Sequence, residues 1–219
     1  MSIMPTIKES TLMDELPGDG QIKSLDVALF IAQTADKHLY HAGFLDKITV
    51  GKIELITYFA QGASLILNGV KLFPDDMYAE GGSVKTERIS GFFGYDRRRV
   101  VKELPSPQEL MKVLTPIQSS FTKWQMMTIN ETIEALAKYD ESHLRRIITS
   151  SESYKAALTR PDKKIRLMDM KNEFSDWYNA ENNYGGLCYA LSSDSFIAIV
   201  LDVALANSSS TSSITILCF

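Results

Sequence analysis

The sequence predicts a mainly helical fold with a small β element. Of its 219 residues, 45% are hydrophobic and 23% are charged, a composition that excludes an intrinsically disordered chain. Apolar residues recur at three- and four-residue steps over most of the length, which is the period of helices that bury one face. Stretches that fit β-strands are short. We therefore expect a single helical domain with a short hairpin or strands around 71–104 and a C-terminal strand at 214–219.

The clearest helix is predicted between Thr49 and Gly69. Thr49 is a suitable N-cap, and Gly69 suits the position after the helix, where a left-handed backbone conformation is common. Leu55, Tyr58 and Leu65 widen its apolar face, so we expect this helix near the centre of the core. The face itself comprises Val50, Ile53, Ile56, Phe59, Ala60, Ala63, Ile66 and Leu67.

The remaining elements follow from the same periodicity and from turn residues. Between residues 71 and 94, Gly81 and Gly82 interrupt a short apolar pattern, which fits a short extended piece, a turn and a short helix. We divide the chain into an irregular leader (1–22), a helical domain (23–180) and a C-terminal extension packed on it (181–219). Further helices are expected at 24–41, 106–114, 126–139, 140–148, from 167 to about 178, and at 196–206, with a strand at 97–104, a turn at 182–186 and a Ser-rich linker at 207–213.

Charge and cysteine content restrict the function. The net charge is −4 and the isoelectric point is near 5.5, whereas proteins that grip nucleic acid usually carry a basic excess. The two cysteines, Cys188 and Cys218, form no disulfide framework. The N-terminus has no signal-peptide pattern, and the apolar run at 196–206 is shorter than the ~20 residues of a membrane span. We expect a soluble, cytoplasmic protein without a membrane partner.

Several residue groups are candidates for a metal site or a catalytic site. His38 and His41 have a spacing that can hold a metal, but no third ligand follows, so solvated or capping histidines are favoured. The acidic group Asp75, Asp76 and Glu80 is interpreted as turn chemistry, because Asp side chains bond neighbouring backbone amides. The sequence contains neither a P-loop nor a nucleophile elbow. We expect no catalytic set, no metal and no cofactor; an enzyme with a site assembled from distant residues is the last alternative.

A family resemblance rests on residues 25–84. The segment KIELITYFAQG at 52–62 is similar to the KLQKLLYYAQG pattern of the Panacea family, the antitoxin domain of many bacterial and phage toxin–antitoxin pairs. Asp26-Val27-Ala28 resembles its first helix, and Asn68-Gly69 with the LFPD segment at 72–75 resembles the stretch after the signature helix. Where the family continues with W-x-Y-G-P-V, this chain reads AEGGSV at 79–84. A late helical pair at 139–157 and a last helix at 164–178 also resemble the family.

The resemblance implies a helical domain that neutralises a toxin-like partner protein by direct contact and is not an enzyme. Homo-oligomerisation stays open. The alternative is a nucleic-acid-binding regulator that uses the basic run Arg97, Arg98 and Arg99, for which a solvated strand face is the simpler interpretation. Phe92 and Phe93 fit core packing as well as they fit a binding surface. The candidate partner-binding residues are Tyr78, Glu80, Phe92, Phe93, Tyr95, Arg97, Arg98 and Arg99.

Overall fold

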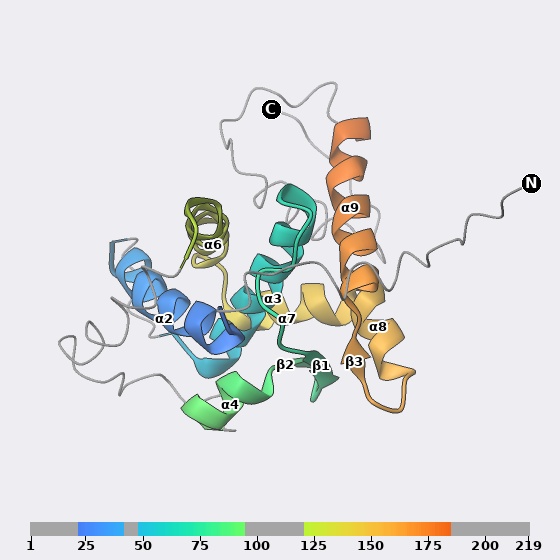
Figure 1. The fold of residues 1–219 in the computed structure, drawn as a ribbon, viewed down its shortest axis with the longest axis horizontal. Helices are drawn as coiled ribbons and strands as arrows, with labels where there is room; N and C mark the ends of the chain where they lie inside the picture. Colours follow the sequence, from blue (N-terminus) through green and yellow to red (C-terminus); the bar gives the residue numbers. More distant parts are fainter. Residues whose placement is uncertain (1–21, 42–47, 95–120, 185–219) are drawn as a thin grey trace, which may run out of the picture.

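The computed structural model describes residues 22–41, 48–94 and 121–184 (Figure 1). These residues form seven helices and one three-stranded antiparallel sheet, which confirms the prediction of a mainly helical fold with a small β element. The helices and strands expected at 97–104, 106–114, 196–206 and 214–219 lie outside the described residues. The helices are α2 (Ser24–His41), α3 (Val50–Leu67), α4 (Glu87–Phe93), α6 (Lys123–Leu136), α7 (Glu141–Ser150), α8 (Glu152–Leu158) and α9 (Leu167–Tyr184); the strands are β1 (Met77–Glu80), β2 (Ser83–Lys85) and β3 (Lys164–Ile165).

Helix α3 is the centre of the structure, as predicted. Thr49 is its N-cap and accepts a hydrogen bond of 3.1 Å from the Lys52 amide. Asn68 is its C-cap, and Gly69 follows with a φ of +68°. Every residue from 50 to 65 is buried, because α2, α4, α6, α7, α9 and β2 all pack against α3. Figure 1 shows α3 surrounded by these elements.

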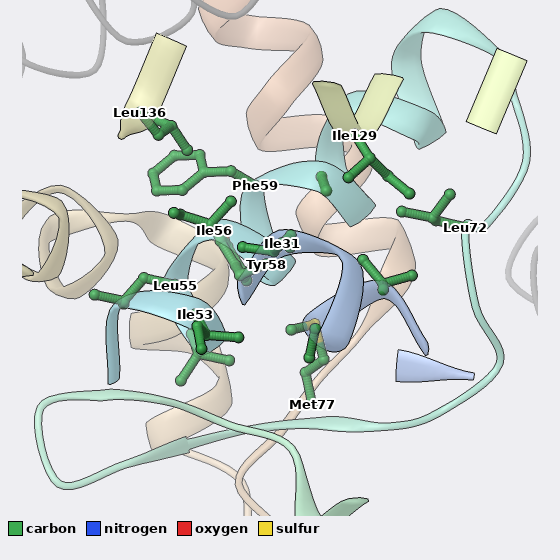
Figure 2. Close-up of a cluster of buried hydrophobic side chains, with 14 of the residues drawn as sticks. Ile31, Ile53, Leu55, Ile56, Tyr58, Phe59, Leu72, Met77, Ile129 and Leu136 are labelled. Carbon is green, nitrogen blue, oxygen red and sulfur yellow. The ribbon is translucent and has the colours of Figure 1, made fainter. Parts of the chain in front are cut away.

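The apolar core lies where α2, α3 and α6 meet (Figure 2). Ile56 and Phe59 of α3 lie beside Ile31 of α2 and beside Ile129 and Leu136 of α6, and all five side chains are almost completely buried. Burying a side chain of this size stabilises the folded state by roughly 1.5–3 kcal/mol. The predicted apolar face of α3 is therefore the spine of the hydrophobic core.

Polar side chains of α3 form hydrogen bonds with different neighbouring elements. The Lys52 ammonium donates a 2.6 Å hydrogen bond to the carbonyl of Ala137 at the end of α6, where the helix dipole favours a positive charge. The Glu54 carboxylate accepts a 2.7 Å hydrogen bond from the Ser90 hydroxyl of α4. Each of these buried hydrogen bonds fixes a neighbouring helix against α3.

Gln61 fixes the chain that leads from α3 to the sheet. Its Oε1 accepts from the amides of Leu72 (2.8 Å) and Phe73 (3.2 Å), and its Nε2 donates to the Phe73 carbonyl (3.2 Å). All of these groups are buried, so no water competes for them. This side chain therefore sets the path of residues 72–76, and with it the position at which β1 begins.

The sheet has the strand order β2-β1-β3. β1 and β2 form a hairpin in which Glu80 lies opposite Ser83. Its two-residue loop is Gly81-Gly82, with φ values of +58° and +69°; positive φ at both positions is the requirement of a type I′ turn. The turn and the short helix after it confirm the sequence-based expectation. The third strand, in which Lys164 pairs with Tyr78, was not expected.

One element boundary differs from the sequence-based expectation, whereas the late helical pair expected at 139–157 is confirmed. Helix α9 runs through Tyr184, so the turn predicted at 182–186 is wrong at its start. Ser151 ends α7 and caps α8 with its side chain, so that residues 141–158 form two helices. The hydroxyl of Ser151 accepts from the Tyr154 amide at 3.3 Å, which restarts a helix immediately after a residue with extended backbone angles.

The close packing of α3 against α9 at Gly62 predicts that Gly62→Ala destabilises the fold. A Cβ at Gly62 would lie 2.3 Å from the ring of Phe174 on α9, and that ring is buried and cannot move away. We expect a loss of about 1–3 kcal/mol in the free energy of unfolding from overpacking, measured by urea denaturation. Gly91→Ala is the matched control, because a Cβ there meets nothing within 4 Å; equal stability of the two variants would contradict the prediction.

The bonds of Gln61 predict that Gln61→Leu destabilises the protein although the shape is largely kept. The substitution leaves two buried amides and one carbonyl at residues 72–73 without their partner, at a cost of about 3 kcal/mol. The free energy of unfolding measures the effect. Asn172→Leu, which replaces an exposed amide on α9, should change it by less than about 0.5 kcal/mol. A Gln61→Leu variant as stable as this control would show that the hydrogen bonds of Gln61 contribute little to the free energy of unfolding.

Candidate protein-binding surface

Asp75 fixes the segment that carries the candidate residues. Its carboxylate accepts from the amide (2.7 Å) and the hydroxyl (2.8 Å) of Ser24 at the start of α2, and it pairs with Arg88 of α4 at 2.5 Å. The interpretation of Asp75 as local turn chemistry is therefore wrong, because its partners lie on two helices. Asp76 and Glu80 instead form surface ion pairs, with Lys164 (2.8 Å) and Lys85 (3.0 Å) respectively.

An open pocket of about 280 Å³ lies beside the hairpin. Strand β1 contributes Tyr78 and Glu80, two of the predicted site residues. The other wall comes from the turn before β3, where the Lys163 carbonyl accepts a 2.9 Å hydrogen bond from the Ala79 amide. Lys163 adopts a φ of +52°, which is uncommon for a residue other than glycine. The lining residues are Tyr78, Ala79, Glu80, Lys85, Glu87, Asp162 and Lys163.

The electrostatics of the pocket act on the Tyr78 hydroxyl. Partial burial raises the pKa of Tyr78, and the nearby carboxylates of Asp76 and Glu87 raise it further, while Lys164 opposes them. Tyr78 therefore stays a neutral hydrogen-bonding group over the physiological pH range. A neutral phenol beside charges of both signs suits polar recognition of another surface, because it can donate and accept.

The two phenylalanines of α4 lie in different environments. Phe92 is 52% exposed, whereas Phe93 is only 8% exposed and belongs to the core. This corrects the assignment of Phe93 to the partner-binding set. The two rings meet edge to face with centroids 5.0 Å apart, so the buried ring supports the exposed one. Tyr95 and the basic run at 97–99 lie outside the described residues, and nucleic-acid binding through that run stays a prediction.

Two buried ionisable groups lie away from this surface. The Glu173 carboxylate of α9 accepts from the amides of Glu152 (2.7 Å) and Ser153 (3.3 Å) at the start of α8, and from the Ser153 hydroxyl. The Tyr58 hydroxyl lies 2.8 Å from the same hydroxyl. Burial raises the pKa of both Tyr58 and Glu173. Their arrangement joins α3, α8 and α9 through a carboxylate that caps a helix.

Neither a metal site nor a membrane span is found in the described parts of the chain. Within residues 22–41, 48–94 and 121–184, no group of three or more His, Cys, Asp and Glu residues is placed to hold an ion. In the same ranges, no helix combines the length and the apolar character needed to cross a bilayer. The side chains of His38 and His41 are outside the description.

Comparison with protein-family models, with curated proteins and with solved structures gives no match to this chain. The resemblance to the Panacea family therefore stays a prediction from the residues at 25–84.

Of the seven residues that line the pocket, sequence reasoning proposed two, Tyr78 and Glu80. Asp162 and Lys163 lie about eighty residues after β1 in the sequence, and only the two-residue strand β3 brings them to it. Their one sequence signal is Pro161-Asp162, a turn dipeptide. Glu87 was similarly unremarkable as an acidic residue in the first turn of α4.

The raised pKa of Glu173 predicts how stability depends on pH. Because the folded-state pKa lies above the ordinary value of 4.5, the carboxyl group favours the folded state at low pH, and this contribution is lost as the pH rises through the folded pKa. The unfolding free energy of the native chain, minus that of Glu173→Gln, should therefore fall as the pH rises from about 4 to 7. Urea denaturation across this range tests it.

Asp176→Asn is the matched control for this comparison, because it removes one exposed carboxylate from the same helix. The pH-dependent difference should be specific to position 173. A difference that rises with pH would show that ionised Glu173 stabilises the cap.

Proposed function

We propose that this chain binds a partner protein by direct contact, in the manner of an antitoxin, through a hairpin surface formed by Tyr78, Glu80 and Phe92. The observation that carries the proposal is Phe92, a large aromatic side chain that is half exposed on a helix whose position is fixed. Aromatic residues on a preformed surface are the typical anchors of protein interfaces.

The helix that presents Phe92 is held from two sides. From the core, the Glu54 carboxylate accepts from the Thr86 amide (3.4 Å) and the Ser90 hydroxyl. From the surface, Asp75 pairs with Arg88. Holding the anchor in place before binding lowers the entropy that association must overcome. Glu87, the first residue of α4, lines the pocket together with Tyr78 and Glu80, so one partner could touch both the hairpin and α4 (Figure 1).

Tyr78 and Glu80 supply the polar part of the proposed surface. They line the same pocket, into which a partner side chain could insert. The ion pair between Glu80 and Lys85 is partly exposed, at 53% for the Glu80 side chain and 20% for that of Lys85, so it contributes little to stability. A charged group of a partner can compete for it. A polar pocket beside an aromatic anchor matches the composition of non-obligate interfaces.

The proposal is tested with the products of the reading frames adjacent to the gene for this chain. We expect one of them to stop growth when expressed alone, and this chain to restore growth when both are expressed. With that purified partner, Phe92→Ala and Tyr78→Ala should each raise the Kd by about 30-fold, equivalent to about 2 kcal/mol, as for interface anchors. Isothermal titration calorimetry measures both.

Met127→Ala is the matched control, because Met127 of α6 is as exposed as Phe92 (51% against 52%) and does not line the pocket. It should leave the Kd unchanged. If growth is restored but Phe92→Ala and Tyr78→Ala bind as tightly as the native chain, the hairpin surface is the wrong one. If no adjacent product binds, the antitoxin-like function itself is contradicted.

A further inference from the structure

A second exposed apolar area lies at the C-terminal end of α3, away from the hairpin surface. Leu67 is 43% exposed and Met127 of α6 is 51% exposed. They lie close together, because the neighbouring residues Asn68 and Thr128 are joined by a 3.1 Å hydrogen bond between their side chains. Trp124, one turn before Met127, is half-buried beside the core. We call Leu67, Met127 and Trp124 the α3-end patch.

Helix α9 leads the chain to this end of the molecule. Phe174 of α9 lies against Gly62, and from that contact both helices continue to the same end, as Figure 1 shows. Tyr184, the last residue of α9, lies ten residues beyond Phe174, which is about 15 Å of helix. The chain that follows α9 therefore starts near the α3-end patch.

The residues after α9 include a segment that suits this patch. Residues 196–206 read FIAIVLDVALA, in which Asp202 is the single polar residue. The eleven residues between Tyr184 and Phe196 can span about 36 Å when extended, more than twice the length of α9 that lies beyond Phe174. Lys123, exposed one turn before Met127 on α6, places a positive charge beside the patch for Asp202.

We propose that residues 196–206 of the same chain cover the α3-end patch. A tethered segment competes at a millimolar effective concentration, which favours it over a separate protein of similar affinity. Covering the patch removes apolar surface of both the patch and the segment from water, which favours the covered state. This interaction is independent of the proposed partner-binding function, because it uses neither β1, β2 nor α4.

The test measures how accessible position 127 is in the full-length chain. In a background of Cys188→Ser and Cys218→Ser, Met127→Cys introduces one thiol into the patch, and its rate of reaction with a maleimide is measured. A segment that covers the patch in nine molecules out of ten leaves the thiol accessible in one out of ten. We therefore expect the reaction rate to rise at least about tenfold when Ile199→Asp, Leu201→Asp and Val203→Asp are added together. On the helix expected at 196–206, positions 199 and 203 share one face and position 201 lies on the opposite face, so the three substitutions disrupt the segment whichever of these faces it uses.

Leu158→Cys is the control in the same two backgrounds, since Leu158 has similar exposure on α8, and its rate should not change. Circular dichroism confirms that both backgrounds fold. A thiol at position 127 that reacts equally fast with and without the three aspartates would overturn the proposal. Protection that depends on protein concentration would also overturn it, because the cover would then be a second copy.

Discussion

The structure depends on the enclosure of helix α3 over residues 50–65. A helix that is buried on every side must satisfy its polar side chains from other elements, because each buried group left without a partner costs about 1–3 kcal/mol. Lys52 donates a hydrogen bond to a carbonyl at the end of α6, Glu54 accepts one from Ser90 of α4, and Gln61 bonds to the backbone at 72–73. Burial of α3 thus fixes where its neighbours lie, in addition to the apolar contacts in Figure 2.

This constraint connects the core to the proposed surface. Gln61 sets the path of the chain into β1, which carries Tyr78, and Glu54 sets the position of α4, which carries Phe92. The exposed residues that we propose for partner binding are therefore attached to the most buried helix by one layer of hydrogen bonds. A surface built in this way keeps its shape before binding, which favours recognition by a preformed site.

Local patterns predicted the helices well but not the contacts between distant residues. Thr49 and Gly69 mark the ends of α3 because capping and C′ preferences act within a few residues. In contrast, β3 is two residues long and has no periodicity to detect. The partners of Asp75 are Ser24, fifty-one residues away, and Arg88. Tyr78 and Glu80 could be proposed from sequence. Asp162 and Lys163 could not, because they are distant in the sequence and come to lie opposite Tyr78 and Glu80 only in the folded chain.

Tyr58 and Glu173 show why a shifted pKa alone does not indicate chemistry. Strongly perturbed groups often mark active sites, and burial raises the pKa of both. Here each oxygen of the Glu173 carboxylate accepts from a backbone amide of α8, at Glu152 and Ser153. The pair also lies inside the core, away from the open pocket beside the hairpin. The need to cap α8 accounts for this carboxylate, and the groups that we propose for partner binding are the exposed ones at the hairpin.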